Sequence, residues 1–179
     1  MALHWTLVAA LGVCSLGWAC EDELGSHSCT DVGCVGGISL RIQSDDAWPA
    51  GSYRLVLEQP GWARECEFEL PLEERSDGRT AAAELRCTPA LELAVAQDSA
   101  CRQTSAPMIG NCVPVPNHYH VEGFITDELT GDLSVRLERA GVTLVDESRP
   151  LSYTEFRPNG PECGPVCEGS NLDVVLPSE

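Results

Sequence analysis

Cysteines behind an export signal constrain the folding of this 179-residue chain more than any other feature. The apolar run 7–13 leads through Gly17, Trp18 and Ala19 to Cys20. A short apolar segment that ends in small residues is typical of a signal peptide, and it is shorter than the about 20 apolar residues that cross a bilayer. Export predicts an oxidising compartment, where cysteines pair. The cysteines that follow Cys20 are Cys29, Cys34, Cys66, Cys87, Cys101, Cys112, Cys163 and Cys167.

Two processing routes fit a signal peptide over residues 1–19. Gly17-Trp18-Ala19 is a small-x-small site after which a signal peptidase can cut. Alternatively, residues 16–20 resemble a bacterial lipobox, with its leucine one position too early, and Cys20 is then the lipid-attachment residue. Lipid on Cys20 leaves an even number of cysteines for disulfides, whereas plain secretion leaves one odd thiol. Cysteine parity therefore favours the lipoprotein.

The charge of the chain limits its partners. It has 28 acidic residues against 11 basic ones, a formal net charge of −17, and no lysine. Nucleic acids and anionic membrane surfaces need basic patches, so we expect no nucleic-acid partner. The expected membrane contact is the lipid anchor alone.

The chain divides into three parts. Residues 1–19 are the signal peptide, and 20–36 are a polar tether that ends in a small loop closed by Cys29 and Cys34. Residues 37–179 are one domain in which apolar and polar residues alternate, as in half-buried strands. Turns at Pro60-Gly61 and Ala140-Gly141 predict two hairpins. The expected strands are 38–43, 52–58, 65–70, 91–95, 119–125, 133–137, 142–145 and 172–176. Two segments are weaker candidates, 153–156 and 81–87, and the alanines of 81–87 could also begin a helix.

This pattern predicts an all-β fold, a disulfide-stapled antiparallel sandwich (Ig-like or similar) of about eight or nine short strands. Residues 97–117 are polar and contain prolines, so they are expected to be a long loop. A local Cys101–Cys112 disulfide would fasten that loop. Cys163 is expected to pair with Cys167, Cys29 or Cys34, although eight cysteines allow 105 connectivities.

Several of these segments together resemble a known group. They are CTDVGCVGGISLRI, WPAGSYRLVL, CEFELPL and FRPNGPECGPVC, followed by an apolar strand. The chain over most of 29–176 resembles predicted cysteine-rich envelope lipoproteins of myxobacterial-type genomes, which have no assigned activity. The resemblance implies an envelope location and a sandwich-like domain, and it supplies no catalytic residues.

The strongest local candidate for a metal site is His118-Tyr119-His120. Side chains at i and i+2 of a strand share a face, so both imidazoles could bind one metal, with Glu122 as third ligand. The alternative interpretation is a solvated outer face. A single strand supplies too few ligands for a closed zinc site, so we expect no metal and no cofactor.

The other candidate binding sites also have structural explanations that involve no ligand. Asp127–Asp132, with Asp45-Asp46, offers oxygen ligands without the spacing of a calcium loop, so a polar turn is expected. Trp48 and Trp62 form either an exposed sugar or peptide patch or a plug at the sandwich end. Thiols at positions 29, 34, 163 and 167 could hold zinc, but export favours disulfides.

The sequence therefore predicts a non-enzymatic protein exported to a bacterial cell envelope, with a structural or interaction role. Its candidate partner is another envelope or extracellular protein. One alternative is a secreted inhibitor or ligand-binding protein that uses 97–117. A second is a metal-dependent hydrolase around His118 and His120, and a third an oxidoreductase that uses Cys163 and Cys167. No nucleophile elbow, zincin motif or phosphate loop is present.

Overall fold

The described part of the chain folds into two β-sheets. The structure, a computed structural model, describes residues 33–34, 36–73, 79–102 and 111–178. These residues form eleven strands and no helix. The fold is the predicted all-β sandwich, with slightly more strands than expected.

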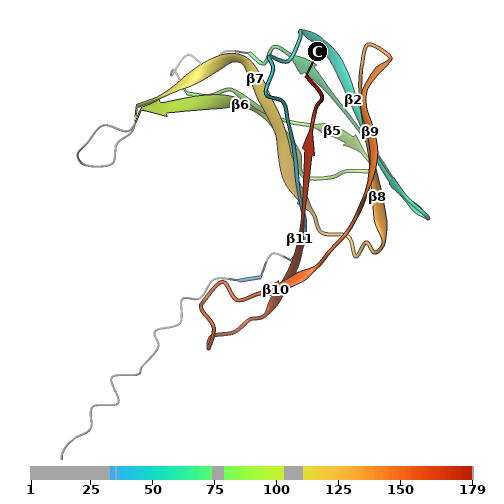
Figure 1. The fold of residues 1–179 in the computed structure, drawn as a ribbon, viewed down its shortest axis with the longest axis vertical. Coiled ribbons are helices and arrows are strands. Elements are labelled where there is room, and N and C mark those ends of the chain that lie inside the picture. Colours follow the sequence, from blue (N-terminus) through green and yellow to red (C-terminus); the bar gives the residue numbers. More distant parts are fainter. Residues whose placement is uncertain (1–32, 35, 74–78, 103–110, 179) are drawn as a thin grey trace, which may run out of the picture.

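The larger sheet has six strands in the order β10-β11-β1-β7-β6-β4 (Figure 1). They are β1 (Gly37–Gln43), β4 (Ala82–Glu84), β6 (Leu93–Arg102), β7 (Asn111–Ile125), β10 (Thr154–Phe156) and β11 (Cys167–Val175). β1 and β11 pair in parallel, whereas the other neighbours are antiparallel. The expectation of a purely antiparallel sandwich is wrong at this pair, because a long connection allows two distant strands to run the same way.

The smaller sheet has five strands in the order β5-β3-β2-β8-β9. They are β2 (Gly51–Gln59), β3 (Trp62–Leu70), β5 (Arg86–Thr88), β8 (Asp132–Arg139) and β9 (Val142–Pro150). Both predicted hairpins are confirmed, β2–β3 and β8–β9. Ala140 and Gly141 both have positive φ, 48° and 79°, as the tight two-residue turn of a hairpin requires.

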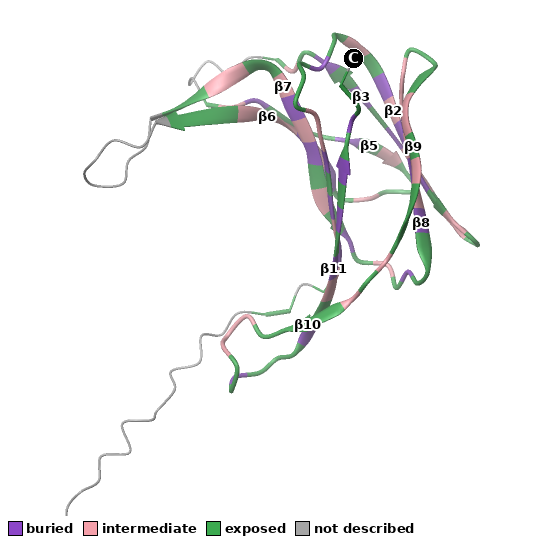
Figure 2. Cartoon of the chain, viewed as in Figure 1, coloured by how far each residue is buried: buried purple, intermediate pink, exposed green. Residues whose placement is uncertain are grey.

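The core lies between the two sheets, where the alternating apolar residues meet (Figure 2). Fully enclosed side chains come from both layers, including Ile38, Leu40, Ile42, Leu55, Leu57, Val95, Val121, Val135, Leu137 and Val174. At roughly 1.5–3 kcal/mol for each buried large side chain, this layer is the main stabilising term of the fold.

The segment 81–87 crosses between the layers. It is not the single strand that its alternation predicts, because β4 pairs with β6 in one sheet and β5 pairs with β3 in the other. Leu85 lies between them and is buried, and its N–H donates to Leu93 O at 2.8 Å. Leu85 is therefore part of the core at the point where the chain passes from one sheet to the other.

The expectation of a long loop over 97–117 is also wrong. β6 and β7 continue as a two-stranded ribbon beyond their neighbours, since β4 ends its pairing at Ala96 and β1 ends its pairing at His120. We call residues 97–102 and 111–118 the arm, and it projects from the body at the upper left of Figure 1. Its polar residues form strands by pairing with each other and need no core.

Candidate functional site

The outer face of the six-stranded sheet is flanked by the arm at one end and by β10 with the start of β11 at the other (Figure 1). A groove of 1230 Å³ lies where this face meets segment 84–94, and a second hollow of 570 Å³ lies toward the arm. Glu122 lines both. This face therefore carries two adjoining open hollows that share Glu122.

Strand register explains the hollow. Glu84 of β4 aligns with Ala94 of β6, which aligns with Glu122 of β7. In the next outward row, Ala96 of β6 aligns with His120 of β7. β6 therefore carries only methyl groups at these two outward positions. Ala94 lies between the longer side chains of Glu84 and Glu122, whereas Ala96 lies between Ala82 and His120. We call Ala94 and Ala96, with their walls Glu84 and Glu122, the alanine trough.

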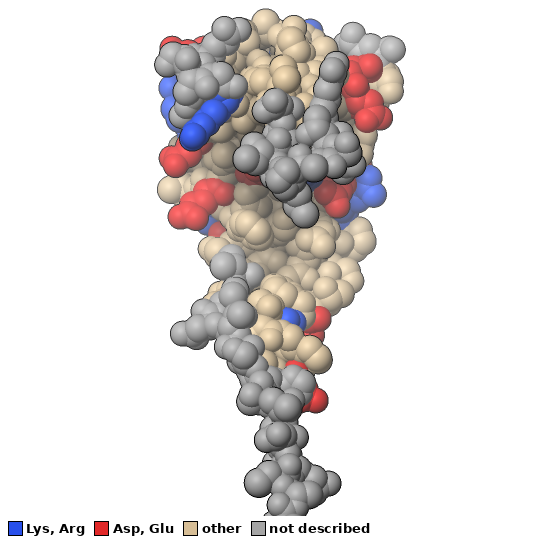
Figure 3. Space-filling view, turned by 90° about the vertical axis from the view of Figure 1, so that its left-hand side faces the viewer, with Lys and Arg blue, Asp and Glu red and all other residues tan. Residues whose placement is uncertain are grey.

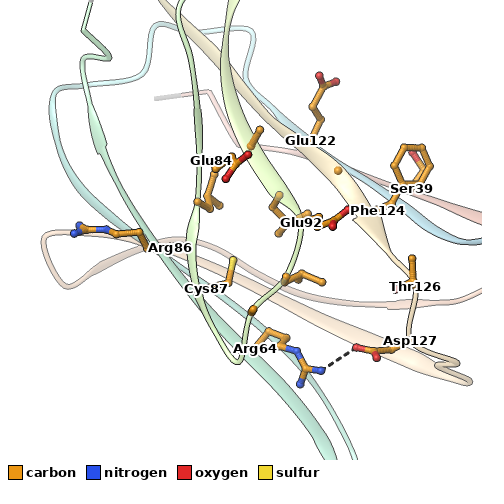
Figure 4. Close-up of a pocket in the computed structure, with 16 residues that line it drawn as sticks. Ser39, Arg64, Glu84, Arg86, Cys87, Glu92, Glu122, Phe124, Thr126 and Asp127 are labelled. Carbon is orange, nitrogen blue, oxygen red and sulfur yellow. Dashed lines mark hydrogen bonds and ion pairs between the residues drawn. The ribbon is translucent and has the colours of Figure 1, made fainter.

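Acidic side chains gather around the trough. Glu84, Glu92 and Glu122 lie on one side of the groove, and Arg64 and Asp127 lie on the other (Figure 4). Seen onto this face, carboxylates lie along both sides of the molecule, with arginines beside some of them (Figure 3). The protein also carries a net charge of −17, so the electrostatic potential here favours a cationic ligand.

His120 is held in the smaller hollow by two carboxylates. Its Nδ1 lies 2.5 Å from Asp98 Oδ1, and its Nε2 lies 3.4 Å from Glu122 Oε2. His118 makes no hydrogen bond or ion pair with any described residue. The described chain contains no group of three His, Cys, Asp or Glu residues arranged to hold a metal, so the candidate set of His118, His120 and Glu122 is not assembled.

Asp127, a candidate oxygen ligand, instead binds two side chains of the β2–β3 hairpin. Asp127 Oδ2 accepts hydrogen bonds from Trp62 Nε1 at 2.7 Å and from Arg64 Nη2 at 2.9 Å. The Arg64 guanidinium also lies 4.7 Å from the centre of the Trp62 ring. These three side chains fasten the end of the β2–β3 hairpin to the segment after β7.

Trp48 plugs the other end of the sandwich and is only 3% exposed. Its ring centre lies 5.5 Å from that of Tyr53 and 6.3 Å from that of Phe68. Tyr53 Oη donates to Pro49 O at 2.5 Å, and burial raises the pKa of Tyr53. Trp48 and Trp62 therefore form no shared binding patch, because they lie at opposite ends of the β2–β3 hairpin.

All seven cysteines of the described chain are disulfide-bonded. Cys101 pairs with Cys112 as predicted, and Cys66 pairs with Cys87 across β3 and β5. Cys34 pairs with Cys167, so the expected Cys29–Cys34 loop closure and a Cys163–Cys167 redox pair are both wrong. Four thiolates are not available for zinc, while Cys20 and Cys29 lie outside the described residues.

An ion-pair cluster that sequence reasoning missed covers the outer face of the smaller sheet. Arg54 lies 2.6 Å from Glu65 and 3.2 Å from Glu138. The two-point contact with Arg54 holds the pKa of Glu65 below its ordinary value. Alternation along β3 predicts that Glu65 faces outward, but the strand order that brings β8 beside β2 is not visible in the sequence.

Comparisons with known proteins return no match to a protein family, a curated protein or a solved structure. Within the described residues, no helix is long and apolar enough to cross a membrane.

Proposed function

We propose that this chain is a non-enzymatic interaction protein of a bacterial cell envelope, held at the membrane by a lipid on Cys20. The observation that carries this proposal is that every described cysteine is in a disulfide. Disulfides persist in oxidising compartments, which agrees with the export signal over 1–19. Cysteine parity then leaves Cys20 for the lipid.

The described fold supports an interaction role. The hollowed face between the arm and the β10 end leaves a broad surface open to a partner. An acidic surface excludes nucleic acid, so the proposed partner is another envelope or extracellular protein. The Cys34–Cys167 bond fastens the end of the tether to β11, away from the arm (Figure 1).

The test is the intact mass of protein taken from the membrane fraction of its native host, with and without reduction and thiol labelling. An amine-reactive tag reports only the N-terminus, because the chain has no lysine. We expect a chain that begins at Cys20, carries acyl mass and has no free thiol. A Cys20→Ala variant should leave the membrane fraction, while the matched Cys14→Ala variant should stay there. An unmodified soluble wild-type chain with an odd thiol would contradict the lipoprotein.

The arm favours a second candidate, a secreted inhibitor or ligand-binding protein. The arm is a ribbon fastened by Cys101–Cys112, and its Val113 is 62% exposed. A fastened recognition segment loses less entropy on binding than a flexible one. For this candidate, a bound partner should protect the arm from proteolysis, and the mature protein should be found free of the membrane.

A further inference from the structure

The alanine trough has the shape of a side-chain channel. Its floor is the methyl groups of Ala94 and Ala96, and its walls are Glu84 and Glu122, one strand away on either side. Neighbouring strands lie about 4.8 Å apart, so the backbones of the two glutamates are about 10 Å apart. That spacing leaves room for one long side chain between the two carboxylates.

The carboxylates around the trough have few contacts with cationic side chains. Glu84 and Glu92 have no ion pair with any described residue. Glu122 lies 3.4 Å from the His120 ring and aligns with Arg41 of β1, whose guanidinium donates to Gln43 instead. The Arg64 guanidinium at the far side of the groove is already bound to Asp127. A cationic group that enters the trough would therefore meet Glu84 on one side and Glu122 on the other, and neither carboxylate is in an ion pair with an arginine of the described chain.

An aromatic ring continues the groove beyond the trough. Phe124 of β7 is 49% exposed and aligns with Ser39 of β1. Its backbone N–H donates to Glu92 O, so the ring lies one outward row from the trough (Figure 4). An exposed aromatic face beside a carboxylate attracts both the alkyl stem and the charged head of lysine or arginine.

We propose that the alanine trough binds an extended basic segment of a partner protein. One Lys or Arg side chain lies over Ala94 with its charged head between Glu84 and Glu122, and a neighbouring one packs on Phe124. The groove of 1230 Å³ exceeds the roughly 300–1,000 Å³ of small-molecule pockets, which favours a polymer over a small cation. This inference rests on the proposed interaction role and names the chemistry of the partner.

The test measures binding of a fluorescein-labelled decapeptide of alternating lysine and glycine to the purified full chain by anisotropy, at physiological salt. The trough variant is Glu84→Gln with Glu122→Gln. The matched control is Glu67→Gln with Glu69→Gln, which removes the same charge from the exposed face of β3. We expect about tenfold weaker binding for the trough variant, because it loses two charge contacts, and less than about twofold for the control.

A third variant separates a specific site from general attraction to an acidic protein. Ala94→Arg places a guanidinium between the two glutamates and fills the trough, so it should also weaken peptide binding. Equal weakening in the trough variant and the control would overturn the proposal, as would tight binding by Ala94→Arg. Spermidine that binds as tightly as the peptide would also overturn it. None of these outcomes depends on Cys20. The proposal for the trough and the proposal for the lipid anchor can therefore be contradicted independently.

Discussion

Asp98 and His120 face each other at the base of the arm, with 2.5 Å between Oδ1 and Nδ1. On β6, one residue, Asp98, separates Gln97 from Ser99. Gln97 pairs with Tyr119 and Ser99 pairs with Pro114, so four residues of β7 lie opposite that one residue. Such a bulge interrupts the ladder and redirects the strand. The pair joins the two strands where the main-chain ladder is broken.

The first prediction concerns this pair. Asp98→Ala should lower the free energy of unfolding by less than about 1 kcal/mol, because the hydrogen-bonded pair is only partly buried. It should nevertheless speed amide hydrogen exchange in the arm relative to Val95 and Val121. The control is His118→Ala, which removes a neighbouring imidazole without a partner among the described residues. Unchanged exchange in Asp98→Ala would show that the pair does not hold the arm.

The second prediction concerns the disulfide of the arm. Cys101→Ser with Cys112→Ser removes a disulfide between cysteines that are 11 positions apart. A bond that closes a loop of this length lowers the entropy of the unfolded chain by an amount equivalent to about 2–3 kcal/mol. Because the arm lies outside the core, the loss should appear as faster exchange at Ala100 and Val113 with the melting temperature nearly unchanged. Cys66→Ser with Cys87→Ser should instead lower the melting temperature, since Cys66 is fully buried in the core. Equal shifts for both double variants would contradict this division.

The third prediction separates the two tryptophans. Trp48→Ala should cost about 3–5 kcal/mol of stability, because it empties a buried site against Tyr53 and Phe68. Trp62→Ala should cost clearly less, because its ring is half-buried and contacts Arg64 and Asp127. Urea unfolding of both variants checks the order. A larger loss for Trp62→Ala would contradict it.

The fourth prediction concerns pH. Hydrogen bonds from Arg54 lower the pKa of Glu65 in the folded protein, so the contact stabilises the fold above the unfolded pKa. This stability is lost as the pH falls through the folded pKa. Between about pH 6 and pH 2.5, wild type should therefore lose more unfolding free energy than Glu65→Gln in urea titrations. Glu67→Gln, which removes an exposed carboxylate without an ion pair in the described chain, should follow wild type.

Much of the fold could be predicted because a strand with one buried face alternates apolar and polar residues along the sequence. β3 and β8 each pack one face on the core, so Cys66, Phe68 and Leu70 alternate with glutamates. Turn chemistry at Ala140-Gly141 then identified the second hairpin. These signals are local, and local signals suffice for hairpins.

The arm and the functional face could not be predicted in the same way. The arm buries little, so residues 97–102 carry no alternation that distinguishes a strand from a loop. The trough depends on the alignment of Glu84, Ala94 and Glu122, which come from three strands. Cys34 likewise finds Cys167 only after β1 and β11 become neighbours. Each of these features requires the strand order, which composition and spacing do not contain.

The Cys34–Cys167 bond gives the protein a mechanical property. The bond ties together the starts of β1 and β11, which are parallel neighbours in register. Tension applied through the tether therefore loads both strands from the same end and in the same direction, so it cannot peel one away from the other. The 133 positions that separate the two cysteines cannot be drawn out while the bond is intact. A pull on the tether that is resisted at the chain's C-terminal end therefore passes through the Cys34–Cys167 bond and β11 and leaves the rest of the sandwich unloaded.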